Sequence, residues 1–163
     1  MDGFAIERWH DFFVAQAGAG AALAGLVFVA ISINLQRLLT TRAVQGRAIE
    51  ALALLVSLLI VGLAALIPQG KMAFATELIL LGFAMSATMI AVGAGGGNAG
   101  GATRRQYALR LILGQCATLP LIAGGVSLLA GSGGGLYWLA VAAFAAIIAG
   151  MIGAWVLLVE ILR

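Results

Sequence analysis

A single acidic residue inside a long apolar stretch is the first place in this sequence to look for chemistry. Glu77 stands in a segment suited to the membrane interior, where ionisable groups usually face a polar path or the interior of a bundle. Small or weakly polar residues lie at helical spacing from it, namely Ala73, Ala84, Thr88 and Ala91. Glu77 and Thr88 are therefore candidates to line a path for cations or protons.

A second interpretation places Glu77 at the membrane surface. It lies about one and a half helical turns from the outer end of its predicted span, where it reaches headgroups or Lys71. Gln16 enters an earlier apolar segment from the same side at a similar depth, so a hydrogen bond between Gln16 and Glu77 would satisfy both side chains in lipid. The sequence leaves both interpretations open.

Pro120 marks the other place where polar groups reach the membrane interior. Gln115, Cys116 and Thr118 precede it, and proline disrupts the backbone hydrogen bond to the carbonyl of Cys116. Kinks of this kind form ion or substrate sites in some transporters, and they also occur as simple bends. A bend is the simpler interpretation, with Gln115, Thr118 and Pro120 kept as candidates for a buried polar site.

The inventory of side chains argues against an enzyme. The only histidine is His10 and the only aspartates are Asp2 and Asp11, so no aspartate pair or serine–histidine relay is available inside a span. A metal or haem site within the bundle is equally unsupported, and the glycines of residues 93–101 are not followed by the lysine and hydroxyl of a nucleotide loop. We predict no catalytic activity, no metal and no cofactor.

The elements that position these residues follow from composition. Of 163 residues, 63% are hydrophobic and only 9% are charged, which does not suit the surface of a small soluble protein. The long apolar runs lack the alternation of barrel strands, so helices of roughly 20 residues must cross the membrane. We predict an all-α integral membrane protein, a single domain over residues 1–163.

Five spans are predicted, over residues 12–35, 48–67, 72–92, 107–130 and 137–161. Residues 1–11 form an interfacial segment before them, with aromatic side chains at the headgroup level. Turn signals separate spans at residues 68–70 and 131–135, and the glycine-rich residues 93–101 form a flexible connection between the third and fourth spans. A re-entrant segment at Pro120 would reduce the count.

The distribution of arginine predicts the orientation. One set of alternate connections holds most of the arginines: Arg37, Arg42, Arg47, Arg104, Arg105, Arg110 and Arg163. The positive-inside rule then places the N-terminus outside and the C-terminus in the cytoplasm, in a plasma (inner) membrane whose anionic headgroups meet the arginine-rich face. The basic residues form no arm suited to nucleic acid.

Small residues predict where helices pack closely. The first span presents one such face, Ala15, Gly18, Ala19, Ala22 and Gly25, and the fifth presents another, Ala142, Ala146, Ala149 and Gly153. These faces meet each other or pack against a second copy, and spacing does not decide between the two. Glu50 and Asn34 lie at span ends near Arg47 and Arg37, where ion pairing or capping at the interface is expected.

Residues 9–13, Trp-His-Asp-Phe-Phe, and the apolar run of residues 21–35 resemble small uncharacterised bacterial multi-pass membrane proteins. Some of those proteins are labelled modulators of a membrane protease. The resemblance is confined to this first part of the chain and includes no catalytic residue.

Two functions are consistent with the sequence. The first is a non-catalytic accessory subunit that packs against other membrane helices, as a homo-oligomer or with a membrane-protein partner. The second is a small homo-oligomeric cation or proton channel that uses Glu77, which would need polar groups along a continuous path. The sparse polar inventory favours the accessory subunit.

Overall fold

The computed structural model describes residues 6–33, 35–36, 42–97 and 104–162. A short 3-10 helix, η1 (Ile6–Trp9), precedes five long α-helices: α1 (His10–Ile33), α3 (Arg42–Leu66), α4 (Lys71–Gly97), α5 (Arg104–Ala130) and α6 (Tyr137–Leu162). Five helices of the described chain are long and apolar enough to cross a membrane, which confirms the predicted fold class.

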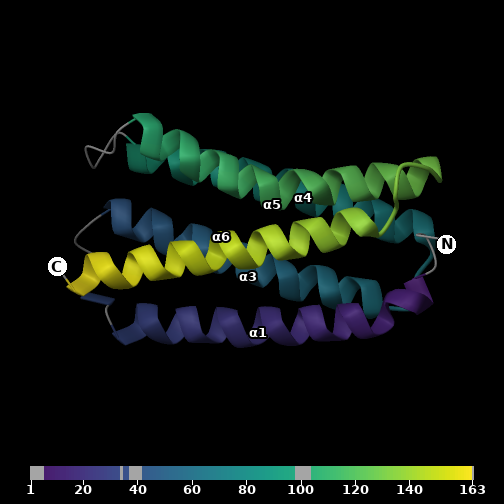
Figure 1. Cartoon of the computed structure of the whole chain (residues 1–163), viewed down its shortest axis with the longest axis horizontal. Helices are drawn as coiled ribbons and strands as arrows, with labels where there is room; N and C mark the ends of the chain where they lie inside the picture. Colours follow the sequence, from purple (N-terminus) through teal and green to yellow (C-terminus); the bar gives the residue numbers. More distant parts are fainter. Residues whose placement is uncertain (1–5, 34, 37–41, 98–103, 163) are drawn as a thin grey trace.

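The long helices lie side by side in one bundle, with α3 at its centre (Figure 1). α3 packs against α1, α4 and α6, while α5 packs against α4 and α6. The N-terminus, the α3–α4 turn and the α5–α6 turn lie at one end of the bundle. We call the opposite end, where α3 and α5 begin and which carries Arg47 and Arg110, the arginine-rich end.

Both predicted turns between the described helices are present. α3 ends at Leu66, two residues before Pro68, whose backbone nitrogen has no hydrogen to donate to a helical hydrogen bond. In the α5–α6 turn Gly131, Gly133, Gly134 and Gly135 have φ between 54° and 101°, a region that favours glycine. The Ser127 hydroxyl, near the end of α5, donates a hydrogen bond to the Ser132 carbonyl and accepts one from the backbone N–H of Gly135 at 2.8 Å. This side chain therefore holds the turn.

Several helix limits differ from the predicted spans. α3 begins at Arg42, not at residue 48, and α4 continues through Gly93 to Gly97, where a flexible connection was predicted. Glycine is a poor helix former, but Gly93 is buried against α5, where a Cβ would lie only 3.2 Å from Cε2 of Tyr107. Close packing therefore extends the helix. α5 is continuous through the buried Pro120, so the alternative of a re-entrant segment there does not apply.

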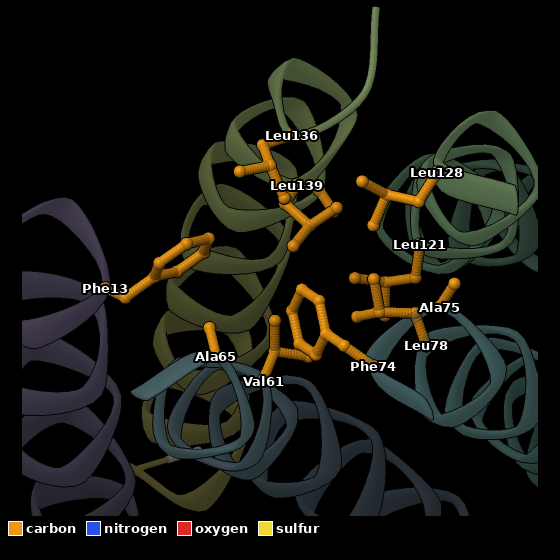
Figure 2. Packing of buried hydrophobic residues seen from close by; sticks show 11 residues of the cluster. Phe13, Val61, Ala65, Phe74, Ala75, Leu78, Leu121, Leu128, Leu136 and Leu139 are labelled. Carbon is orange, nitrogen blue, oxygen red and sulfur yellow. The ribbon is translucent and has the colours of Figure 1, made fainter. Parts of the chain in front are cut away.

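The interior is filled by apolar side chains in two clusters. The first joins all five long helices toward the end that carries the N-terminus, and Figure 2 shows Phe13, Phe74 and Leu139 converging there. Trp9 of η1 contacts Tyr137 of α6, with ring centroids 4.9 Å apart. The second cluster joins α1, α3 and α6 with single residues of α4 and α5. Aromatic residues thus anchor one end of the bundle.

Helix α1 uses a different small-residue face from the predicted one. A Cβ on Gly20 would lie 2.7 Å from the backbone nitrogen of Leu59, and one on Gly62 would lie 2.9 Å from that of Ala17. Ala17, Gly20 and Gly62 therefore form the seam between α1 and α3.

Of the two alternatives that the sequence left open, packing of Gly18, Ala22 and Gly25 within the chain does not occur. A Cβ on Gly18 or Gly25 would meet nothing within 4 Å in the described part of the chain, and Ala22 is exposed. The physical reason is that α1 carries two faces of small residues, and Gly62 of α3 offers close approach only to the face of Gly20.

The small face of the fifth span packs, but against α3 and not against α1. Ala146 and Ala149 are buried. A Cβ on Gly153 would lie 3.2 Å from the Cβ of Ala51 on α3. The first and fifth spans therefore do not meet through their predicted faces, because α3 lies between most of α1 and α6.

Candidate functional site

An ion pair joins α3 and α5 at the arginine-rich end. Oε2 of Glu50 accepts hydrogen bonds from Nη2 of Arg110 at 2.6 Å and from Nε at 3.1 Å. The two side chains keep only 17% and 20% of their accessible surface, respectively. A charge so poorly exposed near lipid needs a partner, and each side chain supplies one for the other.

Helical spacing brings a second arginine to the same place. Arg47 and Glu50 are three residues apart on α3 and share one face. Arg110 faces them from α5, and its Nη2 would lie 3.9 Å from a Cβ on Gly46 of α3. Two guanidinium groups and one carboxylate therefore gather between α3 and α5.

These charged groups lie at one side of a cavity of about 400 Å³. Its remaining lining is almost entirely apolar and comes from α3, α4, α5 and α6: Ala51, Leu54, Met89, Leu109, Leu113, Gly114, Ala149, Ile152 and Gly153. Figure 1 shows α5 and α6 diverging toward the end where the C-terminus lies, and the cavity occupies this region. Its volume falls within the usual range for small-molecule sites.

The polar residues before Pro120 form a local contact between α4 and α5. Ser86 donates a hydrogen bond to Oε1 of Gln115 at 2.8 Å, and Thr118 donates to the same atom at 3.3 Å. Gln115 thus joins the two helices, and Thr118 bonds to Gln115 from the same helix. The backbone carbonyl of Ser86 also accepts from Nε2 of Gln115 at 3.5 Å. Hydrogen bonds of this kind are typical of membrane helix packing.

Gln16 bonds to the bundle interior. Its Nε2 donates to the carbonyl oxygen of Leu58 on α3 at 3.1 Å, and its Oε1 is buried without a hydrogen-bond partner among the described residues. A void of only about 10 Å³ lies beside it, lined in part by Ser57 and Ala142. The space is at the lower limit for one water molecule, so it is not a path across the bundle.

The predicted hydrogen bond between Gln16 and Glu77 is wrong. Glu77 accepts from Nε2 of Gln69 at 2.8 Å, and Gln69 also donates to the carbonyl of Ala64 at 2.9 Å. Gln16 is buried whereas Glu77 is exposed, because the buried face of α4 is that of Phe74 and Leu78 and not that of Glu77.

The stripe around Glu77 faces outward as well. Ala73, Glu77, Ala84 and Ala91 are all exposed on the described chain. The Thr88 hydroxyl donates to the carbonyl of Ala84 on its own helix at 2.8 Å. These residues therefore line no path inside one copy of the chain.

The cluster of Arg47, Glu50 and Arg110 was not predicted as a site, because Arg110 is far in sequence from the other two residues. An interfacial ion pair was expected for Glu50, but its partner Arg110 is 60 residues away. One signal was available, since Glu50 and Arg110 each lie a few residues inside an apolar span, where a charge requires compensation. The predictions on Asn34 and Arg37 fall outside the described residues.

The described residues contain no group of three or more His, Cys, Asp or Glu side chains placed to hold a metal ion. The chain matches no family model, no curated protein and no solved structure.

Proposed function

We propose that this multi-pass membrane protein is a non-catalytic interaction subunit that packs the outward face of α1 against another membrane helix. One observation carries the proposal: among the described residues a Cβ on Gly18 or Gly25 would meet nothing within 4 Å, and Ala22 between them is exposed. Small residues let helix backbones approach closely in lipid, where association depends on short contacts. We call Gly18, Ala22 and Gly25 the α1 outer face.

The filled interior of the bundle favours this function over a pore within one chain. Two apolar clusters occupy the interior, and the void beside Gln16 is only about 10 Å³. A channel would need several copies that bring Glu77 around a common axis, since Glu77 lies on the outside of α4. The partner helix is then either in a second copy or in another membrane protein, and the resemblance of residues 9–35 makes a membrane protease one candidate.

We further propose the inner membrane as location, with the arginine-rich end in the cytoplasm. The support is the concentration of arginine at that end.

Site-directed crosslinking tests the interaction. A cysteine at Ala22, in a Cys116→Ser background, should form a crosslinked adduct in native membranes, and the mass of the adduct tells a second copy from another protein. Leucine at both Gly18 and Gly25 should abolish the adduct while the melting temperature stays unchanged, since nothing in the chain is displaced. A cysteine at Ala87, exposed on α4, is the matched control.

An Ala22 cysteine that crosslinks no more than the Ala87 cysteine would contradict the proposal. The channel has its own test in proteoliposomes, where we expect no cation or proton flux from the wild-type protein. Flux that Glu77→Gln reduces, with an unchanged melting temperature, would instead establish the channel.

A further inference from the structure

We propose that one water molecule is a structural ligand of this bundle, held in its interior by the side chains of Gln16 and Ser57. It occupies the void of about 10 Å³ beside Gln16, where α1, α3, α5 and α6 meet. All ten residues that line this void are buried, so the site is enclosed and separate from the α1 outer face.

The orientation of the Gln16 amide creates the need for a donor. Its Nε2 donates to the carbonyl oxygen of Leu58 at 3.1 Å, and the reverse orientation would set two acceptors against each other. Oε1 therefore points away from Leu58, and it is buried with no hydrogen-bond partner among the described residues. The whole side chain keeps only 6% of its accessible surface. A carbonyl oxygen so deeply buried requires a hydrogen-bond donor.

Ser57 supplies the second contact. Its hydroxyl donates to the carbonyl oxygen of Leu54 at 2.6 Å, so the lone pairs on Oγ are left to accept. Ser57 is buried and lines the same void as Gln16. The water donates one hydrogen to Oε1 of Gln16 and the other to Oγ of Ser57. Buried waters are typically held by about two to four such hydrogen bonds.

Among the described residues, no other side chain at the void can donate to Gln16, because the rest of the lining is leucine, valine and alanine. The site is also far from bulk water. Gln16 lies ten residues after Ile6, where the first candidate span begins, and Ser57 nine residues before Leu66, where the second ends. At about 1.5 Å per residue both lie roughly 15 Å deep, about half the hydrocarbon thickness. A trapped water is therefore the donor that this depth allows.

A crystal structure of the full wild-type chain in a lipid mesophase, at a resolution that shows ordered water, tests the proposal. We expect one water about 2.5–3.0 Å from both Oε1 of Gln16 and Oγ of Ser57. An empty void would overturn the proposal, as would a Gln16 side chain whose Oε1 accepts from a protein group. The wild-type chain alone gives this result, so it does not depend on whether a variant folds.

Thermal unfolding in detergent measures what the water contributes. Ser57→Ala removes one of its two partners and should lower the melting temperature by about 2–4 °C, the shift expected from one lost hydrogen bond. Ser32→Ala is the matched control, because the Ser32 hydroxyl also donates to a carbonyl of its own helix, that of Phe28 at 2.9 Å, but is exposed and outside the void. Equal melting temperatures of the two variants would contradict the water bridge.

A second background separates the bridge from the hydrogen bond that Ser57 makes within α3. Gln16→Met removes the other partner of the water and keeps a side chain of similar length. In this background Ser57→Ala should lower the melting temperature by less than half as much as in the wild type, because no bridge is left to break. An undiminished loss would show that Gln16 and Ser57 do not share a water.

Discussion

At the scale of single residues, compensation of charge decides what the polar side chains do. Glu50 and Arg110 lie within apolar spans, and each is satisfied by the other across two helices. Glu77, which has the same chemistry, lies on the outside of α4 and bonds to Gln69. The Glu50–Arg110 pair therefore joins α3 and α5 within one chain.

Removal of either partner of the Glu50–Arg110 pair should destabilise the protein. We expect Arg110→Gln to lower the free energy of unfolding by about 2 kcal/mol, because the partly buried Glu50 carboxylate loses both hydrogen bonds that it accepts from Arg110. The double variant with Glu50→Gln should lose less unfolding free energy than the sum of the losses in the two single variants. Denaturant unfolding in detergent without added lipid measures all four proteins, with Arg105→Gln as control. Strictly additive losses would show that the ion pair contributes nothing.

At the scale of elements, the helices are held by close approach over a few glycines. The seam between α1 and α3 depends on Gly20 and Gly62, whereas the α1 outer face has open space beside it. Both faces consist of small residues, so each is suited to a close helix contact. One is used within the chain and the other is available to a partner.

Alanine substitutions at the glycines of α1 should distinguish the roles of the two faces. Gly20→Ala should cost about 1–3 kcal/mol of stability, since its Cβ would clash with the backbone of Leu59. Gly18→Ala on the same helix should have no cost or stabilise slightly, because alanine is the better helix former. Thermal unfolding in detergent compares the two variants. Equal melting temperatures would contradict the seam at Gly20.

At the scale of the whole molecule, the bundle is asymmetric along its long axis. Trp9, Phe13, Phe74 and Tyr137 pack together at the end that carries the N-terminus. The other end has the ion pair and the open cavity. We propose that the arginine-rich end lies in the cytoplasm, following the positive-inside rule.

Labelling of introduced cysteines tests this orientation in a Cys116→Ser background, which removes the only native thiol. A cysteine at Ser132, exposed in the α5–α6 turn, should react with an impermeant reagent applied outside intact cells. A cysteine at Gly97, at the end of α4, should react only after lysis. Strong labelling at Gly97 in intact cells would show the opposite orientation.

The helical membrane architecture was determined by the sequence, because hydrocarbon demands that each crossing segment satisfy its own backbone and be long enough to span. The five spans and the turns at Pro68 and at residues 131–135 followed from local patterns of this kind. Such patterns depend on neighbouring residues alone, so no knowledge of packing was required.

Only the tertiary structure decided which faces meet. Gly18 and Gly20 are both small residues of one helix, but only Gly20 has Gly62 opposite it. Glu50 pairs with Arg110 rather than with a local partner, and Gln16 donates a hydrogen bond to the carbonyl of Leu58 rather than to Glu77. The rotation of a helix in lipid depends on the shape of its neighbours, since an apolar surface is equally well solvated by lipid on every side. Contacts between residues far apart in sequence are therefore absent from any local pattern.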